Sequence, residues 1–85
     1  MQKLRLEFNK IGDAGATALA TAVGSGALAS LEKLFLSNNQ IGDDGMKALA
    51  SAVGSGALAA LTSADLRFNP GGSEAVDRAL RERTN

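Results

Sequence analysis

Apolar and polar residues follow two different periods along this chain, and the two periods recur in the same order. The segments Leu4-Arg5-Leu6 and Leu34-Phe35-Leu36 alternate as a short half-buried strand does. Over residues 14–23 and 44–53 the apolar residues return at helical spacing instead. An Asn follows each alternating segment, and a Gly-Ser-Gly connector follows each helical one. The pattern therefore predicts units made of a strand, a turn, a helix and a return loop.

Each predicted helix has a start signal, an apolar face and an end signal. Asp13 and Asp43 are expected N-caps, because their carboxylates can accept early backbone N–H bonds. Gly24 and Gly54 stand where a left-handed C-cap is expected. The predicted apolar faces consist of Ala18, Leu19, Ala22 and Val23 in the first helix and of Ala48, Leu49, Ala52 and Val53 in the second.

The whole unit repeats at a period of 30 residues. Residues 1–30 and 31–60 are identical at 19 of 30 positions, and a weaker third copy occupies residues 61–85. Repetition at a fixed period is typical of a solenoid, in which each unit buries its apolar face against its neighbours. We therefore expect residues 1–85 to form a single domain whose last repeat acts as a C-terminal cap.

The first two units share the order L-x-L-x-x-N-x-I-G-D-x-G, followed by A-L-A. This order resembles the leucine-rich repeat of the ribonuclease-inhibitor-like subfamily. The resemblance implies an α/β solenoid, a horseshoe fragment of three strand–helix units with a parallel sheet on the concave face and helices on the convex face. It implies a ladder of side-chain amides at Asn9, Asn39 and Asn69 that bond backbone groups of the bends. It also implies that the chain holds other proteins.

Composition removes several classes of chemistry. The chain has no Cys and no His, which excludes disulfides, thiolate or imidazole metal sites and the common nucleophile–base pairs. Nine basic residues balance nine acidic ones, which argues against nucleic acid or an anionic membrane as the partner. We therefore predict no catalytic, cofactor-binding or metal-binding residues and no enzyme activity.

The glycine-rich and acidic stretches are interpreted as turn and cap chemistry. Gly24-Ser25-Gly26 follows a predicted helix, whereas a phosphate-binding glycine loop follows a strand and opens a helix. Asp43-Asp44-Gly45 lacks the alternating oxygen ligands and the closing Glu of a calcium loop.

The strand positions that alternate away from the core form a candidate protein-binding face. Arg5, Phe35 and Asp65 are expected to make its middle row, because side chains alternate between the two faces of a strand. All three aromatic residues of the chain lie at variable positions of the repeat, where an aromatic side chain can anchor a partner. The alternative is that Phe8 and Phe68 only cover the sheet rim and that Phe35 packs between Arg and Lys stems. The predicted protein-binding residues are Arg5, Phe35, Asp65, Glu7, Arg67, Lys33, Phe8 and Phe68.

The two ends of the predicted stack differ. Residues 73–85 form an amphipathic last helix with Ser73 as its N-cap and a stripe of Ala75, Val76, Ala79 and Leu80. No polar segment covers the first strand, so its edge is a template for pairing with another chain. Either the chain is a piece of a longer array, or it closes this edge against a second copy as a homodimer or larger oligomer. The predicted self-association edge consists of Met1, Lys3, Leu4, Arg5 and Leu6.

The leading hypothesis is a non-catalytic protein-interaction scaffold that binds through its concave strand face and self-associates through its first coil. One alternative is a truncated or consensus-like repeat polypeptide with no partner of its own. A second is a fragment of an enzyme-regulatory repeat protein, nuclease-inhibitor-like or GTPase-activating-like. The sequence shows no signal peptide or transmembrane segment, so the cytoplasm is expected by default. The expected core leucines are Leu4, Leu6, Leu19, Leu34, Leu36, Leu49 and Leu66.

Overall fold

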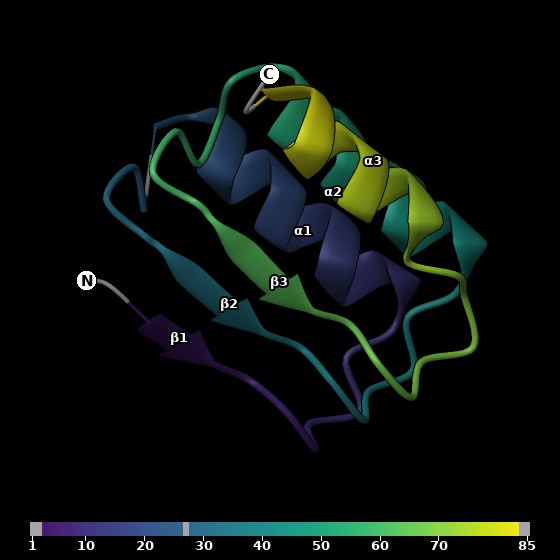
Figure 1. Ribbon diagram of the computed structural model, residues 1–85. Coiled ribbons are helices and arrows are strands. Elements are labelled where there is room, and N and C mark those ends of the chain that lie inside the picture. Colours follow the sequence, from purple (N-terminus) through teal and green to yellow (C-terminus); the bar gives the residue numbers. More distant parts are fainter. Residues whose placement is uncertain (1–2, 27, 84–85) are drawn as a thin grey trace.

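Three strand–helix units stack side by side in the computed structural model, which describes residues 3–26 and 28–83 (Figure 1). Coil 1 contains β1 (Lys3–Arg5) and α1 (Asp13–Gly24), and coil 2 contains β2 (Lys33–Phe35) and α2 (Asp43–Gly54). Coil 3 contains β3 (Ser63–Asp65) and α3 (Glu74–Arg83). The strands form one parallel sheet in the order β1-β2-β3, and the three helices form a second layer beside it (Figure 1). The predicted solenoid architecture is confirmed.

The register of the sheet follows the 30-residue period. Lys3 pairs with Lys33 and Lys33 with Ser63, while Arg5 pairs with Phe35 and Phe35 with Asp65. Equivalent positions of the three coils therefore lie in straight rows across the strands. Each row on the sheet surface therefore consists of the residues at one position of the repeat.

The core lies between the sheet and the helices and is densest in coil 2. Leu34, Leu36, Leu49 and Leu66 are buried, as predicted. The prediction is wrong in coil 1, where the three expected core residues Leu4, Leu6 and Leu19 are only partly buried. The reason is geometric: a coil buries its leucines against both neighbours, and coil 1 has a described neighbour only on the side of coil 2.

The alanines of α1 also differ from expectation. Ala16 and Val23 are buried, whereas Ala18 and Ala22 are exposed. In α2 the equivalent Ala52 is buried and borders the groove that separates α1 from α2. The exposed alanines of α1 thus occupy positions that contact a preceding helix in coil 2, and in coil 1 no described helix lies there.

Asp13 and Asp43 are not the N-caps of their own helices, so this prediction is wrong. Asp13 and Asp43 are the first residues of their helices, the cap positions are Gly12 and Gly42, and neither cap position makes a side-chain bond. Instead, Asp13 Oδ1 accepts the N–H of Gly42 at 2.6 Å and that of Gly45 at 2.9 Å. A carboxylate from coil 1 therefore caps the helix of coil 2, where the free N–H groups and the helix dipole both favour negative charge.

The left-handed residues of the return loops lie two positions later than predicted. Gly24 and Gly54 are the last helical residues, and the first residues with positive φ are Gly26 (98°) and Gly56 (93°), followed by Leu28 (62°) and Leu58 (58°). The intervening Ser25 keeps φ at −83°, and its hydroxyl donates to the Ala22 carbonyl at 2.6 Å. The chain thus turns away from the helix only after the serine.

The asparagine ladder is present at its second and third positions. Asn39 Oδ1 accepts the N–H groups of Asn9 (2.8 Å) and Ile11 (3.0 Å). Asn39 Nδ2 donates to the carbonyls of Leu6 (2.9 Å) and Leu36 (3.0 Å). One buried amide therefore satisfies backbone groups of its own coil and of the coil before it.

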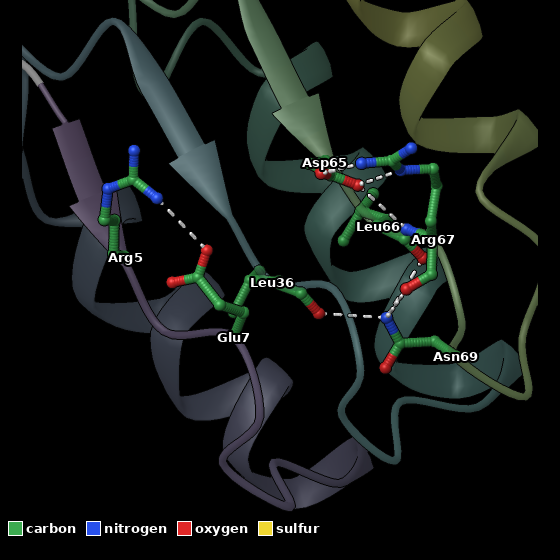
Figure 2. Close-up of polar contacts among 7 residues, drawn as sticks. All are labelled: Arg5, Glu7, Leu36, Asp65, Leu66, Arg67 and Asn69. Atoms are coloured by element: carbon green, nitrogen blue, oxygen red, sulfur yellow. Dashed lines mark hydrogen bonds and ion pairs between the residues drawn. The ribbon is translucent and has the colours of Figure 1, made fainter.

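Asn69 repeats this pattern one coil later, and Asn9 does not. Asn69 accepts from Ile41 (3.1 Å) and donates to Leu36 (2.9 Å; Figure 2). Asn9 is exposed, and within the described ranges its side chain makes one bond, to the Glu7 carbonyl at 3.2 Å. Asn39 and Asn69 each bond backbone groups of the coil before them. Asn9 has no described coil before it, so its amide lacks these partners.

Coil 3 departs from the repeat where it closes the stack. A Cβ at Gly71 would lie 2.5 Å from the carbonyl carbon and oxygen of Gly42, so only glycine fits. Ser73 directly precedes α3, and its hydroxyl donates to the Asp77 carboxylate at 3.1 Å. Of the predicted stripe on α3, Val76 is buried, Ala79 and Leu80 are partly buried, and Ala75 is exposed.

Candidate functional site

The predicted middle row of the concave face exists. Arg5, Phe35 and Asp65 lie opposite one another on β1, β2 and β3. Because side chains alternate along a strand, they lie on the opposite face from the buried Leu34 and Leu66, away from the core. Lys3 and Lys33 form a second row with Ser63 and are exposed. The sheet therefore presents cationic, aromatic and anionic groups at fixed spacing, because adjacent strands lie about 4.8 Å apart.

Phe35 is partly covered by its neighbour in the row. The Arg5 guanidinium carbon lies 4.5 Å from the centre of the Phe35 ring, within the range of a cation–π contact. The same guanidinium is 3.5 Å from Glu7 Oε2 (Figure 2). The Arg5 guanidinium therefore lies over the Phe35 ring. Any partner that reaches the ring must first move Arg5.

Asp65 and Arg67 form a tighter pair at the opposite edge of the sheet (Figure 2). Arg67 Nε donates to Asp65 Oδ1 at 3.0 Å, and its terminal nitrogen donates to Oδ2 at 2.9 Å. These side-chain hydrogen bonds lower the pKa of Asp65 from 3.8, and the reciprocal bonds raise the pKa of Arg67. A bidentate pair of this kind holds both side chains in one orientation.

The two rim phenylalanines are the most exposed large apolar side chains of the described residues. Phe8 and Phe68 are each 73% exposed. Both have left-handed backbones, with φ of 61° and 62°, and Asn38 occupies the same position in coil 2 with φ of 56°. Such a backbone is unfavourable for a bulky residue by about 1 kcal/mol or more. The Arg67 guanidinium lies 6.0 Å from the Phe68 ring. The bends thus carry two exposed rings on one rim.

The predicted self-association edge is only partly within the described residues, because Met1 lies outside them. Lys3 and Arg5 are exposed, and Leu4 and Leu6 are partly buried. Their equivalents in coil 2, Leu34 and Leu36, are 5% and 0% exposed. The outer side of coil 1 is therefore an inter-coil surface that no described residue covers.

The outer side of coil 3 is different in kind. A cavity of about 460 Å³ opens between β3 and α3 there. Its lining includes charged side chains of α3, namely Glu74, Asp77, Arg78 and Arg81. The outer side of coil 3 therefore carries several charged side chains.

Neither a cluster of metal-ligating side chains nor a membrane-spanning helix is found in the described ranges. No group of three or more acidic side chains in residues 3–26 and 28–83 is arranged to hold a metal ion. Over the same ranges, no helix has the length and apolar content needed to cross a membrane. The chemistry of the concave face is thus that of ion pairs and aromatic rings.

Asp13 has a structural role that the sequence did not predict: it caps α2 and not its own helix. Its role of joining coil 1 to α2 depends on the distance between coils, which one repeat taken alone does not contain. The sequence held one signal for this role: Ser73 replaces the aspartate in the third repeat, and no described coil follows that repeat.

Comparison with known families agrees with this geometry. The family model described as "Leucine Rich repeat" matches residues 1–20 and 27–50, which include β1, β2 and most of the helices that follow them. No curated protein and no solved structure matches the chain. Since the family match covers more than half of the 85 residues, the chain belongs to the leucine-rich repeat family.

Proposed function

We propose that this chain is a non-catalytic protein-interaction scaffold of the ribonuclease-inhibitor-like subfamily, binding a partner protein through its concave face and a second copy through coil 1. Leucine-rich repeat domains typically bind proteins, which supports the first part. The subfamily assignment rests on the L-x-L-x-x-N-x-I-G-D-x-G order present in coils 1 and 2.

The observation that carries concave-face binding is the row Arg5–Phe35–Asp65 together with the exposed rim rings Phe8 and Phe68. These side chains lie on a sheet whose bends are fixed by buried amide bonds, so a partner meets a preorganised surface. Aromatic and arginine side chains are also the residue types that contribute most binding energy in interfaces.

In the described part of the chain, the acidic side chains of the concave face are in ion pairs, and two of its lysines are not. Glu7 and Asp65 each have an arginine partner on the face, whereas Lys3 and Lys33 make no ion pair within the described residues. A partner that places an acidic side chain over the two lysines and an apolar one at the rim fits this pattern. The distance between these two places is roughly 16 Å along the strands, about five residues of an extended peptide.

The test of concave-face binding is selection from a random peptide display library, followed by chemical-shift mapping of the selected peptides on the labelled chain. Amide shifts in β1, β2 and β3 are expected, with affinity reduced by Phe8→Ala, Phe68→Ala and Lys33→Glu. Lys47→Glu is the matched control, because Lys47 is exposed on α2, on the convex side. Peptides whose shifts map to the helices, or whose affinity falls equally with the Lys47 variant, would contradict the proposal.

Self-association is the second candidate, favoured by a specific comparison between coils. Leu4, Leu6 and Ala22 are more exposed than Leu34, Leu36 and Ala52, their equivalents in coil 2. An apolar inter-coil surface beside an open strand edge favours pairing with another chain. The molar mass in solution as a function of concentration tests this candidate independently of any peptide.

A further inference from the structure

The outer edge of β1 presents a defined set of backbone groups. Leu6 N–H donates to Phe35 O at 2.8 Å and Phe8 N–H to Ser37 O at 3.1 Å. Because successive residues of a strand direct their backbone groups to opposite sides, Lys3, Arg5 and Glu7 direct theirs away from β2. The open edge thus consists of Lys3 and Arg5 of β1, followed by Glu7, which lies in the turn after the strand and whose carbonyl accepts a bond from Asn9 Nδ2.

The charges on the helices favour the side of coil 1 over the side of coil 3. The described side chains of α1 include one charged group, Asp13. Those of α3 include acidic and basic groups along its length, several of them beside β3 at the outer cavity. A two-fold contact brings each group near its own copy, so a surface almost free of charge is suited to it and a densely charged one is not.

We propose that two copies of the chain join β1 to β1 in antiparallel orientation, with a two-fold axis at Arg5, so that their sheets form one continuous sheet. This inference rests on the self-association proposed above and adds its orientation and register. In this register Arg5 opposes Arg5, and Lys3 opposes Glu7 of the second copy. The two Arg5 residues then form a directly opposed, hydrogen-bonded pair, whereas a shift by two residues places the axis at Leu4 and opposes Lys3 to Arg5, two like charges.

The side chains of the edge agree with this register. Opposing Lys3 to Glu7 of the second copy places unlike charges together twice, once on each side of the axis. The repulsion expected between the two central arginines is reduced, because each guanidinium is already drawn over its own Phe35 ring and toward its own Glu7. The edge is thus self-complementary in charge.

The helices behind the strands permit the same contact. Strands that pair lie about 4.8 Å apart, whereas packed helices need 8–10 Å, so helices behind a continuous sheet must be able to approach closely. α1 presents Ala18 and Ala22 on its outer side, and both are exposed. In coil 2 the equivalent Ala52 already packs beside α1. Small side chains on both copies allow the same approach across the axis.

Single-cysteine variants test the register, because the chain has no cysteine of its own. Residues in a directly opposed, hydrogen-bonded pair have Cα atoms about 5.5 Å apart, within the range that a disulfide spans. Under a mild glutathione buffer, Arg5→Cys is expected to give a covalent dimer on a non-reducing gel. Lys3→Cys and Ser63→Cys are the matched controls, the second lying on the far edge at β3, and neither is expected to cross-link with itself. Reduced Arg5→Cys must keep the unfolding midpoint of the parent chain.

A charge exchange tests the pairing without cysteine. Lys3→Glu is expected to raise the dimer Kd roughly tenfold, since two attractive pairs become two repulsive ones. The double variant Lys3→Glu/Glu7→Lys is expected to recover part of this loss, because it restores the unlike charges but removes the carboxylate beside Arg5. Ser63→Glu, in the same row on β3, should leave the Kd unchanged.

The outcomes separate this inference from the proposal on which it rests. A dimer that fails to cross-link at Arg5, or that is indifferent to Lys3→Glu, overturns the register and leaves self-association standing. Cross-linking only in a mixture of Lys3→Cys and Arg5→Cys chains overturns it in favour of an axis at Leu4. A parent chain that is monomeric at every concentration overturns both, while peptide binding at the concave face is decided by its own experiment.

Discussion

Asn39 and Asn9 occupy the same place in two consecutive coils, and truncating each to alanine is expected to have very different effects. Asn39→Ala removes the acceptor for the Asn9 and Ile11 N–H groups and the donor to the Leu6 carbonyl, all in partly buried surroundings. The Leu36 carbonyl keeps a partner, because Asn69 also donates to it at 2.9 Å. Asn9→Ala removes one bond, to the exposed Glu7 carbonyl.

The magnitudes follow from the groups left without a partner. Each polar group stranded away from water costs about 1–3 kcal/mol. The three groups are only partly buried, so the lower end of that range applies and Asn39→Ala is expected to cost about 3 kcal/mol. Asn9→Ala strands nothing that water cannot reach, so its cost is expected to stay below about 1 kcal/mol. A domain of this length has a free energy of unfolding of roughly 4–13 kcal/mol, so the larger loss is a substantial fraction of the total.

The assay is urea unfolding followed by circular dichroism at low protein concentration, where association contributes little to the apparent stability. The Asn39 variant should show the larger fall in midpoint at an unchanged slope, and its peptide affinity, measured on the folded fraction, should equal that of the parent chain. Equal losses for the two variants would refute the reasoning, because the ladder would then not depend on a preceding coil. An unchanged midpoint for Asn39→Ala would refute it as well.

Three further predictions concern the scaffold. Asp13→Ala should lower the free energy of unfolding by about 1–2 kcal/mol by uncapping α2, whereas Asp43→Ala, whose carboxylate has no bond within the described residues, should change it little; urea midpoints compare them. Gly71→Ala should prevent native packing, and Gly24→Ala, whose added Cβ meets nothing within 4 Å, should be neutral or stabilising by thermal melting. Asp65→Asn should lower the unfolding midpoint at neutral pH only. The lowered pKa of Asp65 means that its carboxylate stabilises the fold above the ordinary pKa of 3.8, and this contribution is lost as the pH falls through the lowered value. Equal losses at neutral pH and at about pH 2 would contradict a stabilising Asp65–Arg67 pair.

The arrangement of the fold was predictable from the sequence because its signals are periodic. A 30-residue repeat that contains one alternating and one helical segment leaves little choice of topology, and the same period sets the strand register. The row Arg5–Phe35–Asp65 followed from that register alone. The exposure of the charged strand residues followed from the alternation of side chains along a strand.

The errors occur where one coil meets another. Alanine is compatible with buried and exposed positions alike, so the pattern of α1 could not tell Ala16, which is buried, from Ala22, which is exposed. The destination of Asp13 depends on the approach of two coils, which local rules for helix caps do not include. Burial of Leu4 was overestimated for the same reason, because the rule for a repeat assumes a neighbour on each side.

The left-handed bends at Phe8 and Phe68 also lay beyond the sequence rules. Those rules assign positive φ to glycine, and here bulky residues adopt it because the conformation is imposed by the repeated bend. The one signal was Asn38, which occupies the same position in coil 2 and belongs to a residue type that tolerates this conformation. Three copies of one bend thus share a backbone that only one of their sequences favours.

The most direct test of the central claim, that coil 1 exposes a surface built to be covered, is light scattering behind a sizing column across a wide range of concentration. We predict a molar mass that rises from 8.6 kDa toward twice that value, and a fall back to 8.6 kDa when Ala22→Arg places a charge on the outer side of α1. Arg78, which lines the cavity on the outer side of coil 3, supplies the control as Arg78→Ala, with the parent mass expected. A mass of 8.6 kDa at every concentration would show that coil 1 is stable in water as it stands and would contradict the claim.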